Sequence, residues 1–383
     1  MPMRIALITE SFPPDVNGVA NSVVRVAEHL VARGHQPMVI APAPSSSARG
    51  VTGPRSYPVV RIPSVPLPRY RGFRFGMPSA RLTDALIAHA PDVVHLASPF
   101  FLGARGVALA NQRNLPTVAV YQTDIAAFLR NYRLGWGEDI TWHWIRTIHN
   151  GADRTLAPSS TSVTDLAEQG IHRVHRWGRG VDTVRFHPSK RSKAVRRALA
   201  RDGEVLVGYV GRLAAEKRLD LLAPLTRMPG VRLVVVGDGP GRKDAEKALP
   251  GAAFLGQRGG DQLARIYASL DVFVHAGPHE TFCQSVQEAM ASGVAVVAPA
   301  AGGPVDLVRP GLTGTLVPPG DATAIADAVG ALAGDAELRQ RYGLAARDAV
   351  AGRTWAAIGD ELIGHYAEVL AARAARPRLA VAA

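Results

Sequence analysis

The sequence predicts an α/β fold of two Rossmann-like domains whose parallel sheets face each other across a central cleft. Short apolar runs alternate with helical patterns along the whole chain, and this strand–helix alternation occurs twice. At 383 residues, the chain is also too long for one ordinary core and suits two domains of average size. Open parallel sheets bind ligands beyond the carboxyl ends of their strands, so two facing sheets place a substrate between them.

The first half of the chain contains seven apolar runs short enough to be strands, with amphipathic segments between them. We predict strands at residues 4–9, 36–41, 59–62, 93–96, 117–121, 154–157 and 174–176. Helices are expected at residues 17–33, 79–90, 103–113 and 160–169. Together these elements predict an N-terminal Rossmann-like domain over residues 1–183.

The second half repeats the alternation. We predict strands at residues 206–210, 232–236, 253–255, 272–275, 295–298 and 315–317. Helices are expected at residues 218–223, 261–270, 285–291 and 322–333. The join is expected near residues 177–188, where Gly-Arg-Gly-Val-Asp interrupts the rhythm before a basic segment at 190–201. A C-terminal Rossmann-like domain should therefore span residues 184–354.

A last helix is predicted at residues 355–372. One of its faces is apolar, with side chains from Trp355, Ile358, Leu362, Tyr366 and Leu370. Because such a face must be buried, we expect the helix to pack back on the N-terminal domain. The tail at 373–383 should be flexible.

Composition places the chain among soluble globular proteins, with 47% apolar and 20% charged residues. No stretch approaches the roughly 18 uninterrupted apolar residues of a membrane-spanning helix. The apolar start is a predicted strand and is too short for a signal sequence. Cys283 is the only cysteine, which excludes a disulfide framework and a zinc site built on cysteines. A cytoplasmic location is the resulting expectation.

The net charge of +12 is unevenly spread. Residues 1–185 hold 20 arginines, no lysine and 12 acidic residues, and a cluster at 66–81 combines Arg69, Arg71 and Arg74 with aromatic residues. Such a cluster can lie on an anionic membrane surface or bind phosphates, and a solvated arginine-rich loop is the alternative. Nucleic acid is not an expected partner, because no helix-turn-helix, RNA-binding or zinc-finger pattern accompanies the charge.

Two carboxylates eight residues apart mark the strongest candidate site. Glu280 would lie at the mouth of a turn formed by Thr281, Phe282, Cys283 and Gln284, where free backbone N–H groups face a ligand. Glu288 would lie about 10 Å further along the following helix, given a rise of 1.5 Å per residue. This spacing suits a sugar at one end and a ribose at the other. A capped helix with two solvated acids is the alternative.

Cations and glycines follow other predicted strand ends. Arg212 and Lys217 lie between a strand and a helix, where they can converge on a diphosphate, although Glu216 could instead neutralise one of them. Gly237 and Asp238 form a turn suited to a flat base, and Gly303 makes room for a ligand beside the backbone. Near the N-terminus, Gly18 opens a helix and would let a phosphate or sugar approach, although a plain turn fits equally.

Three further residues are candidates for a chemical role. Asp124 follows a predicted strand and can bind a sugar hydroxyl, act as a base or cap the next helix. His95 ends another strand, where a structural histidine is the simpler interpretation. Cys283 has no assigned base and is expected to be a small packed residue whose backbone N–H matters more than its sulfur.

The ordered set of motifs resembles the retaining glycosyltransferases of family 4, which share the GT-B fold. The similarity runs from Arg4 to about Tyr366. It rests on Pro13-Pro14 with Asn17-Gly18-Val19, on Gly211-Arg212-Leu213 with Glu216-Lys217, and on the Glu280–Glu288 spacing. Within the family, the chain is most similar to actinobacterial GDP-mannose-dependent α-mannosyltransferases. That similarity rests on segments such as Tyr121-Gln122-Thr123-Asp124 and His279-Glu280-Thr281-Phe282-Cys283-Gln284.

The resemblance implies a role for each matching residue. Arg212 and Lys217 would bind the donor diphosphate and stabilise the leaving group, where other transferases use a metal. Glu288 would hold the ribose. Glu280, with the N–H groups of residues 281–283, would hold the sugar, and Gly18 would admit the pyrophosphate or acceptor. No metal or other cofactor is implied. Asp124 departs from the histidine usual near this position in the wider family, which leaves its role open.

The resulting expectation is a retaining hexosyltransferase on the inner face of the plasma membrane. It would move mannose from GDP-mannose to a glycolipid of the phosphatidylinositol mannoside or lipomannan type, in cell-envelope biosynthesis. The N-terminal domain would bind the acceptor and the C-terminal domain the nucleotide sugar. The alternatives are a UDP-sugar-dependent transferase, a sugar-nucleotide epimerase of the same fold, and a non-catalytic nucleotide-sugar sensor.

Overall fold

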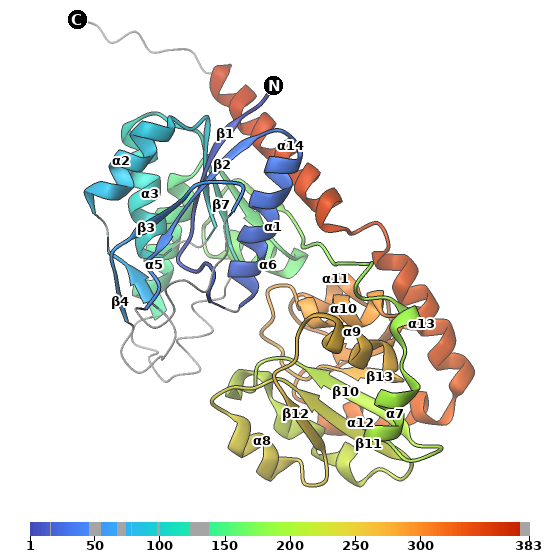
Figure 1. The fold of residues 1–383 in the computed structure, drawn as a ribbon. Coiled ribbons are helices and arrows are strands. Elements are labelled where there is room, and N and C mark those ends of the chain that lie inside the picture. The colour runs from blue at the N-terminus through green and yellow to red at the C-terminus, as the bar shows by residue number, and fades with distance from the viewer. Residues whose placement is uncertain are drawn as a thin grey trace, which may run out of the picture.

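The computed structural model describes residues 1–15, 17–45, 55–66, 74–77, 79–97, 100–122 and 138–375, except for the side chains of Phe75 and Glu138. Two lobes follow each other along this part of the chain, and each contains a parallel sheet with helices on both faces (Figure 1). The predicted α/β fold with two parallel sheets is confirmed.

The N-terminal sheet has seven described strands, all parallel, in the order β3-β2-β1-β6-β7-β8-β9. The strands are β1 (Arg4–Ile8), β2 (Gln36–Pro42), β3 (Val59–Ile62), β6 (Val93–Leu96), β7 (Thr117–Val120), β8 (Arg154–Ala157) and β9 (Val174–Arg176). A separate antiparallel hairpin joins β4 (Ser64–Pro66) to β5 (Arg74–Gly76).

Successive side chains along each strand point to opposite faces of this sheet, which explains why helices cover both faces. In β1, Ile5 and Leu7 belong to a core shared with α1 (Gly18–Ala32), whereas Ala6 and Ile8 pack toward the other face. That second face is covered by α2 (Ala80–His89), α3 (Phe101–Gln112) and α5 (Glu138–Gly151). Near the far edge, α6 (Ser160–Glu168) contacts β8 and β9.

The C-terminal sheet has six described strands, again parallel, in the order β12-β11-β10-β13-β14-β15. The strands are β10 (Val205–Val210), β11 (Val231–Val236), β12 (Ala253–Gly256), β13 (Val272–Val274), β14 (Ala295–Pro299) and β15 (Gly314–Val317). One face carries α9 (Gly260–Ser269), α10 (Gln284–Ala291) and α13 (Ala336–Val350). The other carries the 3-10 helix η5 (Leu219–Arg227), α8 (Arg242–Ala248) and α12 (Ala322–Gly334).

The last helix, α14 (Trp355–Ala374), returns to the N-terminal lobe and lies beside α1 (Figure 1). Its buried residues Ile358, Leu362, Tyr366 and Val369 join the core of that lobe. The Tyr366 hydroxyl lies 2.8 Å from Nδ1 of His95, and the two rings meet edge to face. Since burial lowers the pKa of His95 to about 3, this histidine is neutral and has a structural role.

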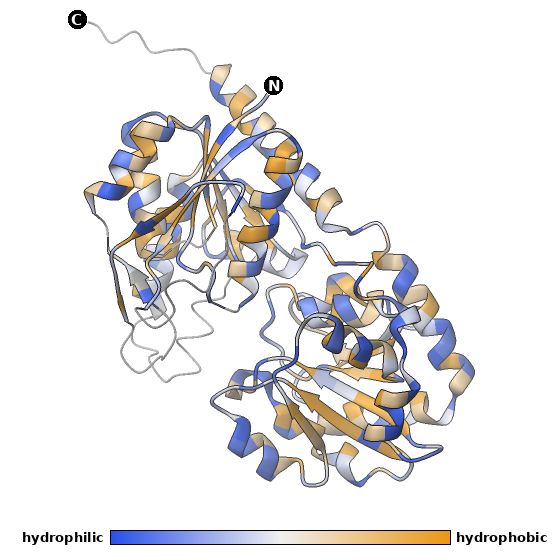
Figure 2. Cartoon of the chain, viewed as in Figure 1, coloured by the Kyte–Doolittle hydropathy of each residue, from blue (hydrophilic) through white to orange (hydrophobic). Residues whose placement is uncertain are grey.

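Apolar residues concentrate in the two sheets, whereas the outer helix faces are hydrophilic (Figure 2). All predicted strands are present within one residue of the predicted ends. The helix predicted at 218–223 is wrong in type, because a 3-10 helix begins at Leu219 after left-handed Arg218 and contains Pro224. Over the described ranges, no helix combines the length and apolarity needed to span a bilayer.

Candidate active site

Loops at the carboxyl ends of strands from both sheets meet between the lobes. Thr281, after β13, donates its hydroxyl to the carbonyl of Gln122, after β7, at 3.2 Å. Asp306 of α11 (Pro304–Leu307) accepts hydrogen bonds from the backbone N and the hydroxyl of Ser160, both at 2.6 Å, at the start of α6. These contacts hold the strand ends of the two sheets against each other, so residues from both lobes reach one site.

An ion pair between Lys217 and Glu280 lies at the centre of this site. Lys217 ends the short 3-10 helix η4 (Ala215–Lys217), and its Nζ lies 2.5 Å from Oε1 of Glu280. His275 Nε2 lies 3.2 Å from the same oxygen. Only 15% of the Lys217 side chain and 19% of the Glu280 side chain are exposed. A partly buried pair at this distance is strongly coupled, so both groups are charged.

The pKa values agree with that charge state. Burial alone would raise the pKa of Glu280, but Lys217 and His275 outweigh burial and lower it to about 2. Burial would likewise lower the pKa of Lys217, yet Glu280 raises it overall. The pair therefore presents one fixed negative and one fixed positive group at neutral pH.

Arg212 is paired differently. Its Nη2 donates to Oε1 of Glu216, the neighbour on η4, and 40% of the Arg212 side chain is exposed. The Tyr209 hydroxyl donates to the Arg212 carbonyl at 3.1 Å and holds the loop after β10. Glu216 thus neutralises Arg212, whereas Lys217 is turned toward Glu280.

The loop from Glu280 to Cys283 has a tightly defined backbone. Phe282 and Cys283 are buried, and Cys283 adopts a left-handed conformation, with φ of 72°, as the N-cap of α10. A left-handed non-glycine residue costs about 1–2 kcal/mol, so the surrounding contacts must compensate. One of them is the Gly303 N–H, which donates to the Glu280 carbonyl at 2.7 Å. The loop is thereby held in one shape.

Glu288 lies about one turn into α10, on the side of Tyr267 and Arg185 rather than of Lys217. Burial raises the pKa of its carboxyl group to about 7. The two carboxylates of the predicted site therefore differ chemically: Glu280 is permanently ionised, and Glu288 titrates near neutrality.

The glycine turn after β11 packs against the loop that carries Arg212. A Cβ on Gly237, whose φ is 134°, would lie 1.9 Å from the Gly211 carbonyl oxygen, so only glycine fits there. Asp238 accepts a hydrogen bond from the Gly239 N–H at 2.8 Å and pairs with Arg242 at 3.4 Å. In the structure, the Asp238 side chain stabilises this turn and its link to α8.

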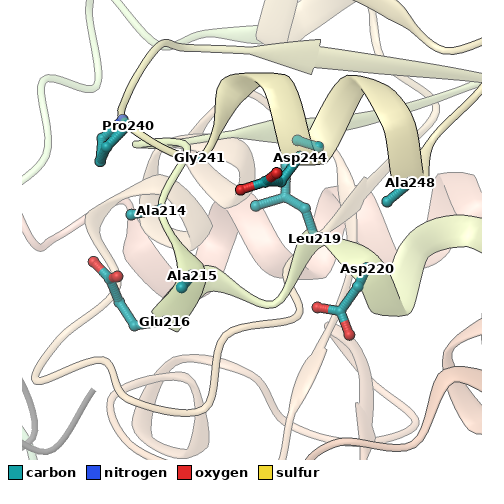
Figure 3. Close-up of a pocket in the computed structure, with 10 residues that line it drawn as sticks. Ala214, Ala215, Glu216, Leu219, Asp220, Pro240, Gly241, Asp244 and Ala248 are labelled. Atoms are coloured by element: carbon teal, nitrogen blue, oxygen red, sulfur yellow. The ribbon is translucent and has the colours of Figure 1, made fainter. Parts of the chain in front are cut away.

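A pocket lies between this turn, η4 and α8 (Figure 3). Its floor is apolar, with Leu219, Ala245 and Ala248, and its rim carries the carboxylates of Glu216, Asp220 and Asp244. An acidic rim repels phosphates. A diphosphate is therefore expected where Lys217 meets Glu280, neither of which lines this pocket.

On the N-terminal side, Gly18 begins α1 and faces a buried arginine that the sequence prediction did not include. A Cβ on Gly18 would lie 3.0 Å from Nη1 of Arg179. That guanidinium donates to the Gly18 carbonyl at 3.2 Å and to Oε1 of Gln122 at 3.0 Å. Arg179 was missed because it lies in the glycine-rich stretch interpreted only as the join between domains.

Asp124, Arg69 and Arg71 lie outside the described residues. Arg74 is described, and it donates to the hydroxyl and the carbonyl of Ser64 at 2.8 Å each, across the β4–β5 hairpin. Its guanidinium thus stabilises the hairpin.

One group of three potential metal ligands occurs within the described ranges: His275, Glu280 and Cys283, whose ligand atoms lie within 4.8 Å of one another. Such a nitrogen, oxygen and sulfur set would suit zinc. However, Glu280 is already neutralised by Lys217 at 2.5 Å, so a cation there would have to displace the lysine. The arrangement fits an ion pair better than a resident metal.

Comparison with known proteins finds similarity along almost the whole chain. Residues 16–185 match the model of Glycosyltransferase Family 4, and residues 190–349 match that of Glycosyl transferases group 1. The chain is 50% identical over 369 residues to a GDP-mannose-dependent alpha-mannosyltransferase of Mycobacterium tuberculosis, covering 96% of this chain and 97% of that protein. It is 34% identical to the sulfoquinovosyl transferase SQD2 of Arabidopsis thaliana, covering 93% of this chain and 72% of that protein.

Solved structures share the fold. The Anabaena protein HepE in complex with UDP superposes with a TM-score of 0.79 at 21% identity, covering 96% of this chain and all of that one. Sucrose-phosphate synthase from Thermosynechococcus elongatus gives 0.80 at 21% identity, covering 97% and 100%. The fold with two parallel sheets is thus shared by proteins of distant sequence.

Proposed function

The chain belongs to glycosyltransferase family 4, and from this premise we propose that it transfers mannose from GDP-mannose, with retention, to a membrane glycolipid. The observation that carries the proposal is the Lys217–Glu280 pair at the meeting of the two strand edges. A positive and a negative group fixed 2.5 Å apart suit a substrate that presents a phosphate beside sugar hydroxyls. The 50% identity to the mycobacterial mannosyltransferase supports GDP-mannose as the donor.

In the proposed reaction, the bond between the sugar and the diphosphate breaks as the acceptor hydroxyl attacks. Lys217, with Arg212 from the neighbouring loop, would stabilise the negative charge that develops on the leaving GDP. Glu280 and the N–H groups of the rigid 281–283 loop would hold the mannose. For retention, the acceptor attacks from the face that GDP leaves, and a phosphate oxygen of GDP accepts the acceptor's proton. These residue roles agree with those that the family resemblance implies.

Exposed side chains on the N-terminal lobe support the proposal that the acceptor is a lipid. Large apolar side chains are exposed on α3 and α5 and beside the β4–β5 hairpin, and the α3 and α5 helices are in contact. These residues are Val65, Met77, Phe101, Ile140 and Trp144, with 38% to 66% of each exposed. Exposed aromatic residues, with α3 in contact with the strand β5 that carries Arg74, suit peripheral binding to an anionic membrane.

The donor and acceptor can be tested with purified full-length protein. Thermal-shift measurements with GDP, UDP and ADP should show stabilisation by GDP, because a ligand that binds the folded state raises the melting temperature. Transfer from GDP-mannose should occur onto phosphatidylinositol mannosides in vesicles and require the lipid. Transfer from UDP-glucose but not GDP-mannose would overturn the donor assignment. Release of free sugar without acceptor dependence would indicate an epimerase, and tight binding without turnover a sensor.

Glu288 makes a pH-dependent prediction for donor binding. Its folded-state pKa is raised to about 7, so the carboxyl group is neutral below pH 7 and ionised above. An ionised carboxylate accepts stronger hydrogen bonds from ribose hydroxyls than a neutral acid does. Affinity for GDP should therefore rise as pH increases from 6 to 8, and Glu288→Gln should lose this dependence. Titration calorimetry at several pH values measures both proteins, and parallel curves would contradict the ribose assignment.

The raised pKa of Glu288 has the opposite effect on folding stability. The pKa of the Glu288 carboxyl is higher in the folded protein than its ordinary value of 4.5, so the folded state binds more protons between pH 4.5 and 7. This contribution is lost as pH rises through 7. Glu10, whose pKa burial also raises to about 7, contributes in the same direction. Donor affinity and folding stability should thus change in opposite directions across pH 7, which distinguishes binding from a general pH effect.

A further inference from the structure

Arg179 is a buried arginine at the site, and it forms no ion pair with a carboxylate in the part of the chain that the structure describes. Only 9% of it is exposed, and none of the described carboxylates lies within ion-pair distance. Its two recorded side-chain partners are neutral: the Gly18 carbonyl and the Gln122 amide oxygen. A guanidinium has five N–H donors, so these bonds leave part of its capacity unused. Because buried charges in proteins are normally paired, an anion is the ligand that this guanidinium is suited to bind.

The backbone of Arg179 is anchored to the C-terminal lobe. Its carbonyl accepts a hydrogen bond from Nε2 of Gln287 on α10 at 3.0 Å, and the next carbonyl, of Gly180, accepts one from Gln284 at 3.1 Å. The side chain, in contrast, reaches Gly18 and Gln122 of the N-terminal lobe. Arg179 therefore spans both lobes at the point where they meet.

The surroundings indicate which anion would complete the site. The Glu280 carboxylate is near enough to raise the pKa of Arg179, which burial nevertheless lowers to about 10. Glu280 is also the partner of Lys217, so both cations interact with the same carboxylate. Gly18 adds the start of the α1 helix, whose dipole favours negative charge. Arg179 is thus linked to the start of α1 through Gly18 and to Lys217 through Glu280.

We infer that Arg179 binds the sugar-linked phosphate of the donor from the N-terminal side, as a further cation beside Lys217 and Arg212. This inference rests on the proposed nucleotide-sugar site, but not on the identity of the base. The contacts of Arg179 with Gly18 and Gln122 would hold its guanidinium in place for this phosphate.

The test compares affinities for a nucleoside diphosphate and its monophosphate in the full-length protein. Calorimetry with GDP and GMP, and in parallel with UDP and UMP, gives their ratio for whichever base binds. In Arg179→Gln, we expect the preference for the diphosphate to fall by about ten- to a hundredfold, as expected for a lost charge-assisted bond. Arg179→Lys should retain part of the preference, because it keeps the charge but loses the planar fork. Arg197→Gln, an exposed arginine on α7 (Lys193–Leu199), is the matched control and should not change the ratio.

A second variant separates phosphate binding from a structural role and does not require removal of the arginine. Gln122→Glu places a carboxylate where the amide oxygen lies, 3.0 Å from Nη2 of Arg179. If Arg179 only holds the lobes together, this ion pair should keep or increase nucleotide affinity. If Arg179 binds phosphate, the new carboxylate should neutralise it and lower the diphosphate preference.

An unchanged ratio in Arg179→Gln, or an unchanged or increased ratio in Gln122→Glu, would overturn the inference. Should Arg179→Gln fail to fold, as judged by circular dichroism, the Gln122→Glu result decides alone. A phosphate of the acceptor is the other possible source of the anion. In that case, the variant would raise the acceptor KM and leave the GDP-to-GMP ratio unchanged, which also counts against the proposal. Failure of the donor assignment is distinguishable, because it would appear as a preference for UDP with the ratio test intact.

Discussion

Lys217→Ala should lower kcat/KM for transfer by about 10²–10³-fold, the loss measured when one donor to a developing negative charge is removed. Lys217 is the cation directed at Glu280 in the centre of the site. Arg212 pairs with Glu216 and has 40% of its side chain exposed, so it does not occupy the position of Lys217 beside Glu280. Initial rates at varied GDP-mannose concentration measure the effect.

The same substitution removes the partner of a largely buried carboxylate. Breaking a buried pair costs about 3–5 kcal/mol, and this pair, with 15% and 19% exposure, should cost less because water still reaches it. The Lys217→Ala/Glu280→Gln double variant removes the orphaned charge and should recover melting temperature but not activity. Lys243→Ala, on the exposed side of α8, is the control that should leave both unchanged. Turnover within a few-fold of wild type in Lys217→Ala would remove this residue from the diphosphate site.

The sheets were predictable because parallel strands are buried on both faces. A run such as Val231–Val236 consists almost entirely of β-branched and apolar residues, and no surface helix requires such a composition. Strand ends followed from polar or glycine residues after each run. The order of strands in the two sheets was not predicted, since it depends on contacts between segments far apart in the chain.

Two of the helices that were not predicted, α7 and α13, bury little or bury small residues. In α13, the buried side of the helix is provided by Gly343, Ala346 and Val350, which give almost no apolar signal among its charged residues. In α7, none of the residues is fully buried, and the helix was interpreted only as a basic segment. Such helices are stabilised by tertiary contacts and capping rather than by a periodic apolar face.

The residue types of the candidate site could be predicted, but not which of its residues pair with each other. Strand ends and charge patterns indicate Lys217 and Glu280, yet nothing in a sequence pairs two residues 63 positions apart. The sequence also does not show which of these side chains are buried. The raised pKa of Glu288 depends on the burial of its carboxyl group, and the position of the Arg179 guanidinium depends on Gln122, 57 positions away in the chain. The division of the two carboxylates into a fixed charge and a titrating acid is therefore a result of the structure.

Gly303→Ala should lower kcat/KM by about 10²-fold while the protein remains folded, because it displaces the loop that is proposed to hold the sugar. Gly303 has φ of −60° and ψ of −30°, which alanine adopts without strain, so the effect is purely steric. Its Cβ would lie 2.1 Å from the Phe282 carbonyl oxygen and 2.4 Å from the Phe282 Cα, and these backbone atoms can only move together with the loop. A shift of about 1 Å at a reacting centre has a cost of this size.

The matched control is Gly364→Ala in the exposed part of α14, where a new Cβ meets nothing within 4 Å. Alanine is favoured over glycine inside a helix by about 1 kcal/mol, so this variant should melt at a higher temperature and retain full activity. The two substitutions are chemically identical, so a difference between them reports only the space around each Cβ. If Gly303→Ala instead transferred mannose at the wild-type rate, the 280–283 loop would have to tolerate displacement, and the proposal that its rigid backbone positions the sugar would fail.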